Sequence, residues 1–250
     1  VQKDTLGPYA EASSVHDDLY RSIQITAGVA MAANVTYLTM QVRKGDSDVR
    51  AMVVGIAPGA VGTPGWPPYL VSGRPISRSH YEAVADIASG FRIGDHVRIR
   101  RHDYNVVGLT RRMVSSSGDP MIFIPLKDAQ QAQFLKDNES ILQGRRRTAQ
   151  NPAFSHPAVP GLLDSVVASQ SSNPYVNAVL VTVKPGFAAE DVAASIRRWQ
   201  RVTAYTRAQM EGILVGKLIA TSARQIGMFL VILAVVSAAI VAFIIYSLTM

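Results

Sequence analysis

The most distinctive pattern in the chain is a long apolar run near its C-terminal end. Residues 228–249 contain no charged residue, no proline and no glycine, and every Lys, Arg, Asp and Glu of the chain lies at or before Arg224. A helix of this length spans roughly 30 Å, the hydrocarbon thickness of a bilayer. The alternative, a wholly buried core helix, is rarely so long and so uniformly apolar. We therefore predict a transmembrane helix over residues 228–249.

The helical pattern begins well before this run. Thr206 and Gln209 have the spacing of a capping box, in which each side chain satisfies a free backbone donor at the start of a helix. Apolar residues then recur at helical spacing from Met210 to Leu218, with charged residues on the other faces. The pattern predicts a stalk helix over residues 206–227 that continues into the membrane helix.

Ahead of the stalk, strand patterns predominate. The predicted elements are a helix over residues 10–21, strands over 23–31, 35–42 and 49–56, a short strand or helix over 81–88, a hairpin over 97–107, a strand over 121–125 and a helix over 127–143. Apolar and basic residues alternate from Val97 to Arg100, which places Arg98 and Arg100 on the solvent-exposed face of the hairpin. Residues 57–68 and 144–160 are rich in turn-forming residues and are predicted to be loops.

A β-α-β unit is predicted directly before the stalk. A strand pattern covers residues 175–183, and a second one covers residues 202–205. Between them, acidic Glu190 stands in the first turn of a helix and basic Arg197 in its last turn, which suits the helix dipole. The fold class is α+β, a body over residues 1–205. Within this body, a first subdomain covers approximately 22–125 and the β-α-β subdomain covers 161–205.

The charge of the chain is positive, with a net value of +7. The basic residues are dispersed, apart from the runs Arg145–Arg147 and Arg98, Arg100 and Arg101. No zinc-finger spacing or pattern of stacking aromatics accompanies them, so we expect a solvated basic surface and no nucleic-acid partner. Arg145–Arg147 leave two interpretations, an exposed loop or a contact with a partner protein.

The search for catalytic and metal-binding patterns finds little. The chain has no cysteine, which excludes disulfides and thiolate sites. It has no P-loop, and Gly55, Gly59 and Gly62 have the wrong spacing for a dinucleotide fingerprint. The five histidines are scattered. We assign no catalytic, cofactor-binding or metal-binding residue, expect no enzyme activity and no cofactor, and leave the substrate-binding residues unknown.

Three weaker candidates have an ordinary structural interpretation beside the chemical one. His16-Asp17-Asp18 could hold a cation, but the favoured interpretation is the wet face of an amphipathic helix. His96 and His102 flank one hairpin and could share a metal ion. Ser115-Ser116-Ser117 has the composition of a turn. A serine hydrolase would require a histidine within reach of a serine or a carboxylate in a cleft.

Several short motifs, in this order, resemble the FtsX-like permease subunits of bacterial ABC transporters, of the MacB type and particularly the DevC type. They are VGI at 54–56, SGRPIS at 72–77, EAVAD at 82–86, GDHVRI at 94–99, YNVVG at 104–108, the Pro185-Gly186 and Tyr205-Thr206 junctions, and AFIIY at 242–246. The resemblance covers nearly the whole chain. On this resemblance, the chain corresponds to the periplasmic core domain of that family, followed by one transmembrane helix.

The resemblance implies a permease subunit that relays ATPase-driven conformational change through the stalk to a periplasmic body. It further implies an ABC ATPase partner that contacts segments outside this sequence, a homodimer, a possible periplasmic adaptor protein and contact with lipid of the bacterial inner membrane. Arg207, Lys217 and Arg224 on the body side would, taken alone, place the body in the cytoplasm; we follow the resemblance. The alternative is a membrane-anchored periplasmic binding or adaptor module without an ATPase partner.

Overall fold

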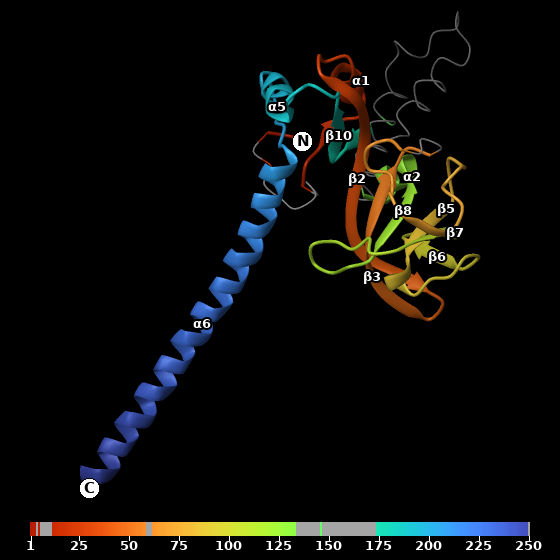
Figure 1. The fold of residues 1–250 in the computed structure, drawn as a ribbon. Helices are drawn as coiled ribbons and strands as arrows, with labels where there is room; N and C mark the ends of the chain where they lie inside the picture. The colour runs from red at the N-terminus through yellow and green to blue at the C-terminus, as the bar shows by residue number, and fades with distance from the viewer. Residues whose placement is uncertain (4, 6–11, 59–61, 134–145, 147–173, 250) are drawn as a thin grey trace, which may run out of the picture. The chain divides into compact units, whose positions relative to one another are not determined.

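The structure is a computed structural model that describes residues 1–3, 5, 12–58, 62–133, 146 and 174–249. The contacts between residues divide the chain into two compact units, Val1–Ala204 and Tyr205–Met250. We call the first unit the body and describe each unit by itself (Figure 1). The predicted loop at 144–160 and the C-terminal half of the predicted helix over 127–143 lie outside the described residues, apart from Arg146.

The body contains most of the regular elements. They are β1 (Val15–His16), α1 (Leu19–Gln24), β2 (Val29–Lys44), β3 (Ser47–Ile56), β4 (Leu70–Gly73), β5 (Glu82–Asp86), a 3₁₀ turn (Ile87–Ser89), β6 (His96–Ile99), β7 (His102–Thr110), β8 (Met121–Pro125), α2 (Leu126–Gln133), β9 (Tyr175–Val176), β10 (Ala178–Val183) and α5 (Ala189–Arg197).

The main sheet closes on itself. Its strands follow the order β10-β2-β3-β8-β5-β7-β4, and β6 pairs with both β7 and β2. The pairing of β6 with β2 joins Arg98 to Arg43 and completes a ring of six strands, β2-β3-β8-β5-β7-β6. Within the ring, β3 runs parallel to β8 and β5 runs parallel to β7, while the other neighbours are antiparallel. β2 is the long curved strand in Figure 1.

Alternating side chains fill both faces of the ring. Ala51 and Val53 of β3 belong to one buried cluster, whereas Met52 and Val54 belong to another. The same alternation holds on β8, because successive strand residues point to opposite faces. The first cluster gathers residues from all six strands of the ring and includes Ala129 and Ala132 of α2. A third cluster packs α1, α5 and β9 together through Val15, Ile23, Val29, Val176, Val192, Ile196 and Val202.

Elements with a strong local pattern are confirmed. β2 and β3 form a hairpin around Gly45-Asp46, and β6 and β7 form the predicted second hairpin, with Arg98 and Arg100 exposed. β8 has the predicted bounds, and α2 begins within one residue of the prediction. The segment over 81–88, for which strand and helix were both open, is a buried strand followed by one 3₁₀ turn.

Three predicted elements near the ends of the body are wrong. The helix over residues 10–21 is replaced by β1 and by α1, which begins only at Leu19, and the strand over 23–31 is replaced by α1 and the start of β2. Ile23 is apolar and falls within the predicted strand over 23–31, but it is a buried residue of helix α1. The strand over 202–205 is also wrong, because Val202 forms a single bridge with Gln2. Strand β10 pairs instead with β2, so no β-α-β ladder forms from these segments.

The second unit contains α6 (Arg207–Thr249), a helix of 43 residues. Its start confirms the predicted capping box: the Thr206 N–H donates to Gln209 Oε1 at 3.2 Å, and the Gln209 N–H donates to Thr206 Oγ1 at 3.4 Å. Among the described residues, no helix is both long and apolar enough to cross a membrane.

Candidate functional site

A buried carboxylate fixes the loop that leads into β5. Glu82 is 4% exposed and binds the guanidinium of Arg74 through both carboxylate oxygens. Its Oε2 also accepts hydrogen bonds from the Ser77 N–H at 2.9 Å and the Arg78 N–H at 3.0 Å. The bonds from Arg74, opposed by burial, lower the pKa of Glu82 to about 2. The SGRPIS motif at 72–77 and the EAVAD motif at 82–86 are therefore two halves of one structural clamp.

A second buried carboxylate holds the other end of the same loop. Asp128 of α2 is 3% exposed, contacts His80 Nδ1 through Oδ1, and accepts a hydrogen bond from the Tyr81 N–H at 3.0 Å. The Tyr81 carbonyl accepts from the Asn105 N–H at 3.0 Å. Burial, with a further contribution from the charge of Asp128, raises the pKa of the neighbouring Tyr104 phenol and keeps it neutral.

Aromatic rings collect on this loop. The Tyr81 ring lies 5.8 Å from the His80 ring, 5.6 Å from the His102 ring and 6.0 Å from the buried Tyr104 ring, measured between centroids. Tyr81 adopts φ 61°, a left-handed conformation that bulky residues rarely adopt. This cluster could not be predicted from the sequence, because Asp128 is 48 residues away from His80 and belongs to α2.

The acid sensitivity of the body is expected to depend on Glu82. Its pKa is lower in the folded chain than the ordinary 4.5, so the stability it contributes is complete above about pH 5 and is lost as the pH falls towards 2. The shift corresponds to roughly 3 kcal/mol. Urea unfolding at pH 5 and pH 2.5 should show this loss in the natural chain, beyond the loss that the same change of pH causes in Glu82→Gln. Equal losses in both chains would contradict the role of the clamp.

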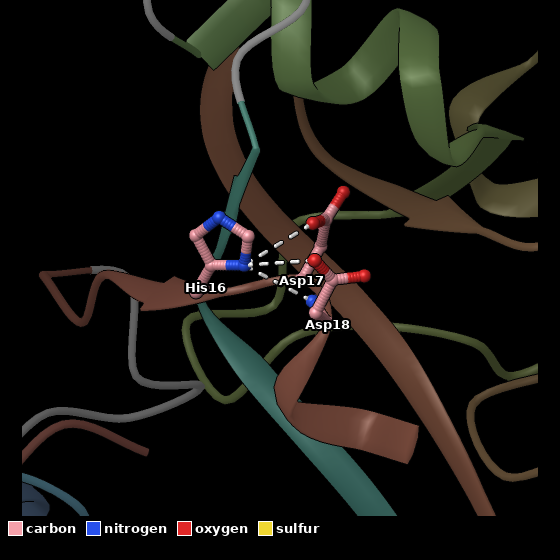
Figure 2. A group of neighbouring side chains, drawn as sticks. All are labelled: His16, Asp17 and Asp18. Atoms are coloured by element: carbon pink, nitrogen blue, oxygen red, sulfur yellow. Dashed lines mark hydrogen bonds and ion pairs between the residues drawn. The ribbon is translucent and has the colours of Figure 1, made fainter. Parts of the chain in front are cut away.

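The side chains of the predicted cation candidate, His16, Asp17 and Asp18, lie close together and already contact other groups of the protein. His16 ends β1, and Asp17 and Asp18 follow it ahead of α1 rather than on a helix (Figure 2). Within the described part of the chain, this is the one group of three or more such side chains whose ligand atoms all lie within 4.8 Å of one another. The Asp18 N–H donates to His16 Nδ1 at 3.3 Å, and Lys127 Nζ lies 3.3 Å from Asp17 Oδ2. We assign no metal site to this group.

The remaining candidates are not brought into one site. His96 pairs with Asn105 and His102 pairs with Ile99, so the two histidines lie three residues apart along the β6–β7 ladder, about 10 Å. Ser115 Oγ accepts N–H bonds within its own turn, which confirms the predicted turn at 115–117. The run Arg145–Arg147 is described only at Arg146, and His156 and Gly59 lie outside the described residues.

The hydrolase alternative meets one of its requirements. His80 and Asp128 supply a histidine beside a carboxylate. No serine hydroxyl contacts His80 in the part of the chain that the structure describes. A nucleophile within hydrogen-bond reach of the histidine defines such sites. Among the described residues, Asp128 contacts His80 and the Tyr81 N–H, an arrangement that holds the loop.

Comparison with known families decides the class of the protein. The family model described as the MacB-like periplasmic core domain matches residues 1–199. The chain belongs to this family. The MacB-like core domain covers the body almost to its end and stops ahead of α6. The resemblance to MacB-type permeases is thereby confirmed at the level of this domain. Domains of this family are parts of ABC transporter permeases, which are not themselves enzymes.

Solved structures of similar domains come from several bacteria. The extracellular domain of the noncanonic ABC-type transporter YknZ from Gram-positive bacteria is 10% identical, with 72% of this chain and 79% of that chain covered and a TM-score of 0.47. The periplasmic region of MacB from Actinobacillus actinomycetemcomitans is 9% identical, with 74% and 73% covered and a TM-score of 0.45. A domain of a putative permease from Porphyromonas gingivalis is 14% identical, with 78% and 74% covered and a TM-score of 0.42. The comparison with curated proteins finds no match.

Proposed function

We propose that this MacB-like core domain and its helix belong to a permease subunit of a bacterial ABC transporter, with the body in the periplasm and α6 entering the inner membrane. The observation that carries the proposal is the match of the family to residues 1–199, followed by a helix of 43 residues. In this proposal residues 1–205 form the periplasmic core, 206–227 the stalk and 228–249 the transmembrane helix.

The composition of α6 supports a lipid environment for its C-terminal part. No charged residue occurs after Arg224. Phe229, Leu230 and Val231 are each more than half exposed. Leaving such apolar surface in water costs about 25 cal/mol per Å², so a continuous apolar helix requires another solvent or a partner. A bilayer supplies that solvent along a whole helix and leaves every backbone hydrogen bond within it.

The connection between body and helix supports a mechanical role. The first residues of the chain pair with the last residues of the body: the Thr203 N–H donates to the Val1 carbonyl at 2.9 Å, and the Lys3 N–H donates to the Arg201 carbonyl at 3.0 Å. Arg197 Nε binds the Ala204 carbonyl at 2.8 Å. Only Tyr205 and Thr206 then separate Ala204 from α6. We infer that an ABC ATPase partner moves the stalk and that this short connection passes the movement to the body.

The partners in this proposal are an ABC ATPase, a second copy of the subunit and a periplasmic adaptor protein. Affinity purification of the full-length protein from its own membranes tests the first of them. Recovery of a P-loop ATPase in a constant ratio to the subunit supports the permease. Recovery of the full-length protein without any ATPase would favour the membrane-anchored binding or adaptor module instead.

Cysteine labelling gives a direct test of the topology, because the natural chain has no cysteine. Ser72→Cys places a thiol on an exposed strand of the body, and Ser237→Cys places one in the apolar part of α6. We expect a membrane-impermeant maleimide to label the first variant in intact spheroplasts and the second only after detergent is added. Labelling at Ser72→Cys that requires lysis would place the body in the cytoplasm. Full labelling at Ser237→Cys without detergent would exclude the membrane helix.

A further inference from the structure

Residues 77–81 form an exposed loop whose backbone N–H groups are bound by two buried carboxylates. Glu82 binds the N–H groups of Ser77 and Arg78, and Asp128 binds the N–H of Tyr81. Both carboxylates are almost fully buried, whereas all five residues of the loop are exposed. A surface loop anchored at both ends loses little conformational entropy when it binds a partner, and it is preorganised in that sense.

Tyr81 is the last residue of this loop, directly before β5. Its left-handed backbone is an uncommon conformation for an aromatic residue, and such strain persists only where surrounding bonds impose it. Here the hydrogen bonds to Asp128 and Asn105 hold the backbone of Tyr81, and the residue remains 53% exposed, with its ring beside those of His80 and His102. A ring that served only to stabilise the fold would be buried in the core. An exposed ring held in a strained conformation instead suits contact with another molecule.

The exposed charged residues next to His80 and His102 in the chain are mainly positive. Arg78 is 79% exposed, although its Nε lies 3.6 Å from Glu82 Oε1. The exposed Arg100 and Arg101 immediately precede His102, whose ring contacts Tyr81. The two carboxylates beneath the loop are buried and bound, whereas Asp103 of β7, next to His102, is an exposed acidic residue. Tyrosine and arginine on a rigid surface are also the residues that most often dominate the energy of protein–protein contacts.

We propose that Arg78, His80, Tyr81, Arg101 and His102 form a docking surface for an acidic segment of a partner protein. The proposal deepens the proposed function and rests on it in one respect, that the partner is a protein that meets the body outside the cytoplasm. The Tyr81 ring packs against the partner, and the two arginines pair with its carboxylates. An exposed carboxylate–arginine pair is weak in isolation, so the ring is needed to exclude water from the contact.

Binding of a defined acidic polymer tests the surface. The full chain in detergent is titrated with a fluorescein-labelled random copolymer of glutamate and tyrosine, and fluorescence anisotropy is recorded. Tyr81→Asn removes the ring while retaining a residue that tolerates the left-handed conformation. Arg78→Gln removes one charge. We expect each of these variants to weaken binding roughly tenfold, the range of a residue at the centre of a contact.

Matched controls separate the surface from general attraction to a positive protein. Arg111→Gln removes one exposed charge elsewhere, and Tyr69→Ala removes another exposed tyrosine. Both should leave the affinity within twofold. Equal weakening by Arg78→Gln and Arg111→Gln, or unchanged binding by Tyr81→Asn, would overturn the proposal. Tyr81-dependent binding that is tighter for oligothymidylate or for phosphatidylglycerol vesicles would also overturn it, in favour of a nucleic acid or a membrane.

The labelling pattern of Ser72→Cys and Ser237→Cys, recorded in a chain that also carries Tyr81→Asn, distinguishes failure of the docking surface from failure of the proposed function. An unchanged pattern with unchanged copolymer binding would overturn the docking surface alone. A labelling pattern that places the body in the cytoplasm would overturn the topology, and with it the identity of the partner, even where the copolymer binds through Tyr81.

Discussion

Alanine in place of Gly73 is expected to lower the free energy of unfolding by about 3 kcal/mol or more, because two costs add. Gly73 has φ 81°, in the left-handed region that side chains other than glycine rarely adopt. A Cβ atom at this position would also lie 2.3 Å from the Val107 carbonyl oxygen and 2.8 Å from Gly108 Cα. Both are backbone atoms of β7, to which Gly73 is paired, so neither can move without breaking the β4–β7 ladder. Urea unfolding followed by circular dichroism measures the loss.

Gly45→Ala separates the two costs. Gly45 has φ 56°, but no atom lies within 4 Å of the position that a Cβ would take. We therefore expect about 1 kcal/mol from backbone strain alone. If Gly73→Ala cost no more than Gly45→Ala, the close approach of β4 to β7 could not be the reason why glycine is required in the SGRPIS motif. Amide exchange within β4 and β7 should rise in Gly73→Ala and remain unchanged in Gly45→Ala.

Glutamine in place of Glu82 is expected to remove about 3 kcal/mol of stability at pH 7, the equivalent of the lowered pKa. The amide is nearly the same size as the carboxylate, so the loss reports charge and hydrogen bonding rather than packing. Glutamine cannot accept the paired bonds from Arg74 as a charged group, and its N–H₂ group faces donors at Ser77 and Arg78. Denaturant unfolding at pH 7 measures the difference.

A surface pair supplies the control for that substitution. Glu190 binds Arg197 at 3.0 Å, but the Glu190 side chain is 57% exposed, so Glu190→Gln should cost less than about 1 kcal/mol. At pH 2.5 the natural chain and Glu82→Gln should approach the same stability, because the carboxyl of Glu82 is then protonated in the unfolded chain and most of the stability from its lowered pKa is lost. A Glu82→Gln variant as stable as Glu190→Gln at pH 7 would show that the loop at 74–82 does not depend on the buried carboxylate.

Local signals explain the parts of the fold that the sequence predicts. Gly45-Asp46 between two alternating runs is sufficient to predict the β2–β3 hairpin, and Thr206 with Gln209 is sufficient to predict the start of α6. β8 could be predicted to the residue because a short apolar run stands between Pro120 and the start of α2. In each case the residues that decide the structure are close together in the chain.

Long-range pairing explains the parts that could not be predicted. Val15 becomes a strand residue only because Val176 pairs with it, and the ring closes only where Arg98 meets Arg43. Val202 is apolar and nearly buried, yet its neighbour is Gln2 at the other end of the body. An apolar run does not reveal whether it pairs in a ladder or only packs against a helix.

The candidate site shows the same division. The Arg74–Glu82 clamp lies within two motifs that the resemblance had already selected, although their physical role required the structure. The aromatic cluster could not be predicted from the sequence, where His80 is one of five scattered histidines and Tyr81 begins the segment predicted as a short strand or helix. Their significance depends on Asp128, which folding brings from α2. The predicted grouping of His16, Asp17 and Asp18 was present, but Lys127, distant in sequence, already neutralises part of it.

The pairing of Val1–Lys3 with residues 201–203 has a consequence for the ancestry of such proteins. Backbone hydrogen bonds hold residues 1–3 beside residues 201–203. A domain whose ends are adjacent can be inserted into a loop of another chain without moving the two sides of that loop apart. One recipient loop could thus acquire, lose or exchange the domain as a cassette while its flanking helices keep their spacing.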